Sequence, residues 1–143
     1  MANSRMDPKV KALSTVGIFS SCSKKELQSV ARLCTPLSVE EGFVLTTEGT
    51  AGLQCFVIVD GTASVTIGGR KVNEVGPGEC VGELALLDGG PRTATVTAES
   101  PMNVYALSVS KFRSLLGVSP TILRKIVTSL ARRLRAREAD YPH

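Results

Sequence analysis

Residues 53–69, which read LQCFVIVDGTASVTIGG, are the clearest indication of the fold. Two β-prone runs in this stretch are separated by the turn dipeptide Asp60-Gly61, and the second run ends at Gly68-Gly69. Glycine suits such turns because it adopts a positive φ without steric strain, as tight hairpin turns require. The stretch therefore predicts two successive β-hairpins.

Short β-prone runs of the same kind occupy residues 37–108, with glycine-containing turns between them. The strands predicted from these runs cover residues 43–47, 53–59, 63–67, 71–75, 94–97 and 103–107. Many short strands at this spacing are typical of antiparallel barrels and jelly rolls. We expect a mainly β protein built on an antiparallel jelly-roll β-barrel.

The N-terminal lead-in, residues 1–36, is predicted to be helical. A helical turn is expected over residues 10–16, and Ser23 and Glu26 have the spacing of a capping box that starts a second helix. The apolar face predicted for that helix comprises Leu27, Val30, Ala31 and Cys34. Pro36 is expected to stop the helix, because proline has no N–H to donate.

Residues 109–143 are predicted to form two C-terminal helices. Ser110 is expected to cap a short helix over residues 111–116, and Gly117 to end it. Pro120 opens a longer helix whose predicted apolar face comprises Leu123, Ile126, Val127, Leu130 and Leu134. A chain of 143 residues with this order of elements is expected to be a single domain over residues 1–143.

The composition argues against several classes of protein. No run approaches the roughly 18 apolar residues of a membrane span, and the polar N-terminus is not a signal peptide, so we expect a cytoplasmic protein. His143 is the only histidine, so we expect neither histidine-dependent catalysis nor a metal site, and the chain is not predicted to be an enzyme.

The four cysteines, Cys22, Cys34, Cys55 and Cys80, form no C-x-x-C motif. We interpret them as small buried apolar residues, with a disulfide framework as the less favoured alternative. The net charge of +4 is concentrated in residues 120–143, which hold six basic and two acidic side chains. A basic helix of this kind is typical of a solvated face or of a nucleic-acid contact.

The series of predicted strands and glycine turns is interrupted at residues 82–96, GELALLDGGPRTATV. A helical turn at the start of this segment would offer backbone N–H groups to an anion, and Arg92 would add a charge-assisted contact. Glu83 would repel an anion, but it would accept a hydrogen bond from a neighbouring hydroxyl. These residue types together suit a ligand with one negative charge and a sugar hydroxyl.

The segment resembles the phosphate-binding cassette of the cyclic nucleotide-binding domain family, which reads G-E-x-A-L, a short loop, and P-R-(T/S/A)-A. Here the cassette covers residues 82–94, and the resemblance extends outward to Phe56–Gly61 and to the long helix after Pro120. The resemblance implies a jelly-roll domain that binds a cyclic nucleotide. It requires no other cofactor.

The resemblance also implies roles for single residues. Glu83 would accept from the ribose 2′-hydroxyl and Arg92 would pair with the cyclic phosphate. The phosphate shell would be completed by the Leu84 and Ala85 amides and by Thr93. Gly82 and Ala94 complete the set of predicted ligand-binding residues. We favour cAMP as the ligand. cGMP stays the alternative, because a threonine at position 93 is compatible with either base.

The long helix departs from the family at its end. Bacterial regulators place a Thr-Ser pair there that contacts adenine, whereas this chain has Arg137 and Glu138. Arg137 is therefore a candidate lid that stacks over the base.

The favoured function is a stand-alone cyclic nucleotide sensor whose C-terminal helices move on binding. The alternative is a protein-interaction module with a degenerate or secondary nucleotide site. The C-terminal helix is expected to bind a protein partner or a second copy of the chain. Direct DNA binding is not expected, because no room remains after this helix for a helix-turn-helix domain.

Overall fold

In the computed structural model, which describes residues 7–138, two four-stranded antiparallel sheets enclose an apolar core. One sheet has the strand order β1-β8-β3-β6 and the other β2-β7-β4-β5. The strands are β1 (Cys34–Val39), β2 (Val44–Thr46), β3 (Gln54–Asp60), β4 (Ala63–Ile67), β5 (Arg70–Val75), β6 (Cys80–Val81), β7 (Thr95–Ala98) and β8 (Met102–Ser108). The predicted jelly-roll class is confirmed.

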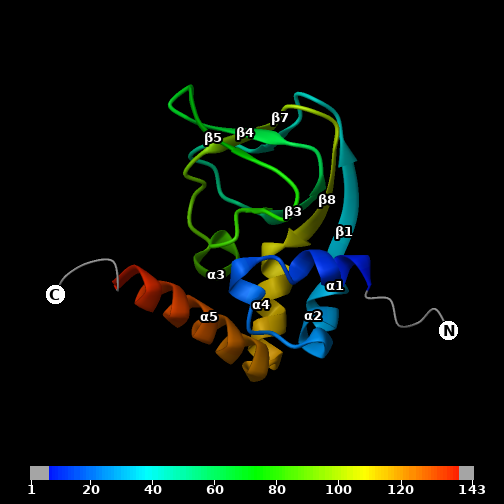
Figure 1. Cartoon of the computed structure of the whole chain (residues 1–143), viewed down its shortest axis with the longest axis vertical. Helices are drawn as coiled ribbons and strands as arrows, with labels where there is room; N and C mark the ends of the chain where they lie inside the picture. The colour runs from blue at the N-terminus through cyan, green and yellow to red at the C-terminus, as the bar shows by residue number, and fades with distance from the viewer. Residues whose placement is uncertain (1–6, 139–143) are drawn as a thin grey trace.

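The helices gather at one end of the barrel (Figure 1). They are α1 (Pro8–Leu13), the short 3-10 helix η2 (Gly17–Phe19), α2 (Lys24–Ala31), α3 (Ala85–Asp88), α4 (Val109–Val118) and α5 (Pro120–Glu138). The single turn α3 lies between the barrel and α5 in this view. None of the helices within residues 7–138 is long and apolar enough to cross a membrane.

Strand β3 is buried on both of its faces. Phe56 and Ile58 belong to the core inside the barrel, whereas Cys55 and Val57 belong to a second core formed with the helices. Side chains alternate along a strand, so a strand packed on both sides reads as a continuous apolar run. This explains why residues 55–58 show no polar alternation.

Of the two predicted hairpins, the structure contains one. Gly68 and Gly69 have φ of 59° and 79° and join the paired strands β4 and β5. Gly61 also has a positive φ, of 90°, but the turn at Asp60-Gly61 carries the chain from one sheet to the other. The prediction of a hairpin there was wrong because β3 pairs with β6 and β8 instead.

The N-terminal helices form with shifted limits. The predicted helical turn is α1, which begins at Pro8 and is capped by Asp7. The capping box of α2 is confirmed: Ser23 N–H donates to Glu26 Oε1 at 2.7 Å, and Glu26 N–H donates to Ser23 Oγ at 3.2 Å.

Helix α2 ends at Ala31 rather than at Pro36, which lies inside β1. This strand was not predicted from the sequence. It is an edge strand, where proline is tolerated because one side of the strand needs no donors. Cys34, expected on the helix, is the first residue of the strand.

The C-terminal helices also differ from the predictions. Helix α4 is capped by Ser108 rather than Ser110, and it continues through Gly117. On α5 the buried residues are Ile122, Ile126 and Ser129. The predicted apolar face combined two faces of the helix, because Leu123, Val127 and Leu134 are exposed, at 43%, 56% and 62%.

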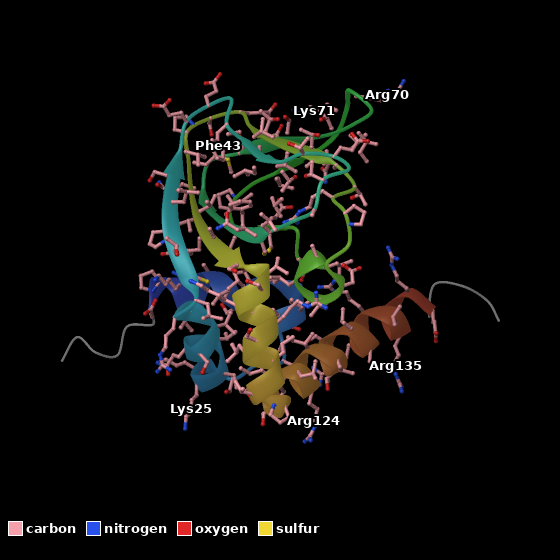
Figure 2. All side chains as sticks on the ribbon, turned by 180° about the vertical axis from the view of Figure 1, so that it is seen from behind. Lys25, Phe43, Arg70, Lys71, Arg124 and Arg135 are labelled. Carbon is pink, nitrogen blue, oxygen red and sulfur yellow. The ribbon has the colours of Figure 1, made fainter. Side chains whose placement is uncertain are left out.

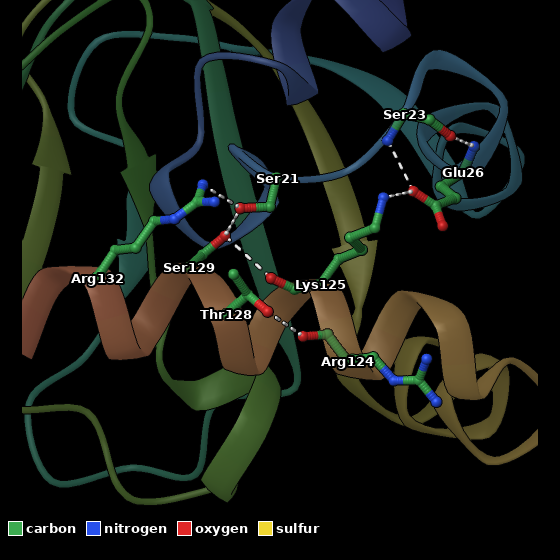
Figure 3. Close-up of polar contacts among 8 residues, drawn as sticks. All are labelled: Ser21, Ser23, Glu26, Arg124, Lys125, Thr128, Ser129 and Arg132. Carbon is green, nitrogen blue, oxygen red and sulfur yellow. Dashed lines mark hydrogen bonds and ion pairs between the residues drawn. The ribbon is translucent and has the colours of Figure 1, made fainter.

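Polar contacts hold α5 against the segment that precedes α2 (Figure 3). Ser129 and Arg132 both donate to Ser21 Oγ at 3.1 Å. Lys125 Nζ lies 3.2 Å from Glu26 Oε1, so the same carboxylate caps α2 and pairs with α5. The two ends of the described chain are therefore joined in one helical layer.

Candidate functional site

The predicted cassette, residues 82–94, forms a compact loop between β6 and β7. Gly82 has a φ of 84°, and Gly89 ends α3 in the left-handed conformation at 64°. Ala85 N–H donates to the Gly82 carbonyl at 3.2 Å. The amide of Ala85, expected to be free for an anion, is therefore engaged within the loop in this structure.

Most of the predicted ligand-binding residues line one pocket of about 340 Å³. These residues are Gly82, Glu83, Leu84, Ala85, Arg92 and Thr93. Ala94 lines a second pocket of about 280 Å³ on the barrel side, together with Val65, Val96 and again Arg92. The Arg92 side chain thus lies between the cassette pocket and the mouth of the barrel.

The Arg92 guanidinium is buried, and no carboxylate of residues 7–138 pairs with it. The residue is 8% exposed, and its Nη2 donates to the carbonyl of Gln54 on β3. Within residues 7–138, its Nε and Nη1 atoms have no hydrogen-bond partner. Buried charged donors are normally paired, so the free donors favour an anion at this position.

Two glycines make room for this guanidinium. A Cβ atom built on Gly52 or on Gly82 would collide with the Arg92 side chain. Gly82 was predicted from the sequence, whereas Gly52, which precedes β3, and Gln54, which begins it, were not. Both contact the guanidinium only because the fold brings their segment to Arg92, so no local sequence pattern could have identified them.

Glu83 is held by the helical layer rather than by Arg92. Its Oε2 accepts from Ile18 N–H at 2.8 Å and pairs with Arg133 Nη2 on α5, also at 2.8 Å. Gly17 lies against both side chains: a Cβ there would be 3.2 Å from Glu83 Oε2 and would collide with Arg133. The cassette and the C-terminal helix are therefore linked by an ion pair.

The other arginines of α5 are not brought to the cassette. Figure 2 shows Arg124 and Arg135 pointing away from the body of the molecule. Arg137 is exposed in the last turn of α5 and does not line the cassette pocket. Its role over the base stays a prediction. Arg133, which was expected only as part of a basic face, contacts Glu83.

Comparison with known proteins identifies the family. A model of the cyclic nucleotide-binding domain matches residues 36–118, more than half of the chain. This chain belongs to that family. The match confirms the resemblance carried by the cassette and places this cyclic nucleotide-binding domain among regulatory domains.

A curated relative is a cyclic nucleotide-gated potassium channel of Rhizobium etli. It is 34% identical over 85% of this chain, which spans 34% of the channel's length. A solved structure of the regulatory domain of Toxoplasma gondii PKA with cAMP is 32% identical, with a TM-score of 0.69 over 74% of this chain and 42% of that one.

A third similar structure is the N-terminal domain of a transcriptional regulator from Streptomyces coelicolor. It is 27% identical with a TM-score of 0.77, and the match covers 94% of this chain and 96% of that one. The cyclic nucleotide-binding domain described here therefore shares its helical flanks, as well as its barrel, with this solved structure.

Proposed function

We propose that this domain is a regulatory sensor that binds cAMP at the cassette pocket, with the cyclic phosphate on Arg92. The observation that carries the proposal is the buried guanidinium, two of whose donor atoms have no partner in the described part of the chain. A phosphate would supply the missing acceptors through charge-assisted hydrogen bonds. The cAMP in the Toxoplasma gondii structure supports the choice of nucleotide.

Isothermal titration calorimetry with cAMP, cGMP and AMP tests this proposal. We expect saturable one-site binding of cAMP, weaker binding of cGMP, and none of AMP, which keeps the base but lacks the cyclic phosphate. The absence of heat and of a thermal shift at millimolar cAMP would overturn the proposal and favour a degenerate site. Tighter binding of cGMP would reverse the assigned base preference.

The proposal includes a movement of α5 on binding. Glu83 is the carboxylate expected to accept from the ribose, and in the present arrangement Arg133 and Ile18 N–H already occupy its Oε2. A ribose hydroxyl that takes Glu83 would weaken the ion pair and release the second half of α5. A ligand shifts such an equilibrium only through this difference in affinity for the two arrangements.

Hydrogen exchange measures this movement directly. With saturating cAMP we expect faster amide exchange in residues 130–138 and unchanged exchange in β3 and β8, which pair with each other in the barrel. Equal exchange rates in α5 with and without cAMP would contradict the movement, whatever the affinity. We also propose that residues 1–143 act as one domain, since α5 is held by contacts with Ser21 and Glu26.

A second candidate function, self-association through α5, is favoured by an apolar stripe that the barrel leaves uncovered. Leu123, Val127, Leu130 and Leu134 recur at intervals of four, three and four residues, the heptad spacing of a coiled coil. Three of the four are exposed and Leu130 is half-buried. A second copy of the helix would cover the stripe.

Sedimentation equilibrium tests this candidate. We expect a dimer for the native chain and a monomer for Val127→Glu. Thr121→Glu, which places the same charge at an exposed position of α5 off the stripe, should remain dimeric. A native chain that is monomeric at 100 µM, or a dimeric Val127→Glu variant, would contradict the proposal.

A further inference from the structure

Two cysteine thiols meet beside the cassette. Cys55 on β3 and Cys80 on β6 have their Sγ atoms 2.7 Å apart, although 25 residues separate them in the chain. In the register of the two strands Val57 is opposite Cys80, so Cys55 and Cys80 lie on the same face of the sheet. The separation is only about 0.7 Å longer than a disulfide bond.

Of the four cysteines, Cys55 and Cys80 are the two whose thiols lie side by side. Cys34 is buried and its thiol faces the Val30 carbonyl at 3.7 Å. Cys22 lies near Glu26 and Lys125, in the helical layer. Cys55 is fully buried and Cys80 is half-buried, so Cys80 is the more accessible of the two to a small oxidant.

The two thiols belong to the strands that hold the Arg92 guanidinium. Gln54, which accepts from Arg92, precedes Cys55, and Gly82, which packs against the guanidinium, follows Cys80 by two residues. A bond between the two sulfur atoms would therefore join both walls of the Arg92 site.

We propose that Cys55 and Cys80 form an oxidisable dithiol that hydroperoxides convert to an intramolecular disulfide. The Cys80 thiol gives up its proton as its sulfur attacks the peroxide. The O–O bond breaks, the leaving oxygen takes the proton and departs as an alcohol or water, and Cys80 becomes a sulfenic acid. The Cys55 sulfur then attacks the sulfenic sulfur, and water leaves as the S–S bond forms. Two thiols and one hydroperoxide thus yield one disulfide, one alcohol or water and one further water.

The surroundings of this pair make its oxidation slow. The hydrogen bond with Cys55, together with burial, raises the pKa of Cys80 well above its usual range, so the thiol is stored in the protonated form. Once formed, the disulfide would hold β6 and the cassette against β3. This second consequence rests on the proposed function, because its readout is nucleotide affinity.

Peptide mapping of the full chain treated with hydrogen peroxide tests the disulfide itself. We expect the free thiols to fall from four to two, and a thiol reductant to restore them. Cys34 and Cys55 share one tryptic peptide, so a second cleavage at Glu48 is needed to separate them. Fragments linked through Cys55 and Cys80 support the proposal, whereas a Cys34–Cys80 link or no link overturns it.

Variants supply the control. Cys55→Ala and Cys80→Ala should lose the disulfide, and Cys34→Ala should keep it. Oxidation should raise the melting temperature of the native chain by about 5–10 °C and leave that of Cys55→Ala unchanged. An equal change in both proteins would contradict the assignment.

Calorimetry with cAMP measures the coupling to the site. We expect the oxidised chain to bind cAMP at least about threefold more weakly than the reduced chain, because the disulfide retains the arrangement in which Arg92 faces Gln54. Equal affinities would refute the coupling while the mapped disulfide stands. If neither form binds cAMP, the proposed function fails and the peptide map alone decides the dithiol.

Discussion

The cassette and helix α5 use arginine in opposite ways. Arg92 lies in the part of the chain that is neutral overall, yet it is buried, and two of its donor atoms find no partner among residues 7–138. Residues 120–143 carry the whole net charge of +4, but the arginines of α5 are exposed, and Arg133 is already paired with Glu83. Burial and the lack of a partner within residues 7–138, rather than the number of charges, are therefore our grounds for proposing Arg92 as the anion site.

Replacing the guanidinium should have the largest effect. Arg92→Met is expected to weaken cAMP binding at least about 100-fold, because the charge-assisted contacts to the phosphate are lost. The same change should raise the melting temperature of the ligand-free protein, since an uncompensated buried charge is removed. Calorimetry and thermal denaturation measure the two effects.

Arg124→Met is the matched control, because Arg124 is exposed on α5. It should leave both quantities unchanged. If Arg92→Met binds cAMP within threefold of the native chain, Arg92 does not hold the phosphate, and the proposed difference between Arg92 and the arginines of α5 is wrong.

The next effect is expected at the glycines that enclose Arg92. Gly82→Ala forces a left-handed residue to carry a Cβ and places that atom on the guanidinium. We expect a loss of about 1–3 kcal/mol in the free energy of unfolding and weaker cAMP binding. Gly117→Ala in α4 meets no atom within 4 Å and should gain about 0.5–1 kcal/mol. Urea denaturation compares them, and equal effects would show that Gly82 has no special packing role.

The contacts that anchor α5 should respond to acid. The Ser23 backbone N–H lowers the pKa of Glu26, with a further contribution from Lys125, so the folded state favours the carboxylate. This contribution is complete above the unfolded pKa of about 4.5 and is lost as the pH falls through the lower folded value. Glu26→Gln keeps an acceptor in the capping box and should cost about 0.5–1 kcal/mol at pH 7.

Urea denaturation at several pH values measures the pH dependence. The difference between the native chain and Glu26→Gln should shrink from pH 5 downward. Glu41→Gln, at an exposed turn, should show no such trend. A difference that stays constant down to pH 3 would argue against a role for the Glu26 charge.

The smallest effect is expected for the ion pair between the two regions. Arg133→Ala frees Glu83 for the ribose, so cAMP should bind about two- to fivefold more tightly, as expected for a half-exposed pair. Arg135→Ala, one of the exposed arginines of α5, should bind as the native chain does. Weaker binding by Arg133→Ala would mean that Arg133 assists the ligand instead of competing with it.

Local sequence patterns predicted the elements whose causes are local. Glycine turns and β-prone runs located six of the eight strands, and the capping box located the start of α2. Strand β1 was missed because its proline and polar residues suit an edge strand, whose partner β8 lies far along the chain. The Asp60-Gly61 dipeptide is typical of a hairpin turn. However, β3 pairs with β6 and β8, so it lies in a different sheet from β4.

The sequence alone determined the family and the residues of the cassette, because their order and spacing are local and specific. Tertiary structure decided what each side chain meets. It brought Arg133 and Ile18 to Glu83, Gln54 and Gly52 to Arg92, and Cys55 to Cys80. These partners are tens of residues apart and become neighbours only when the sheets and the helical layer close, so no local pattern could identify them.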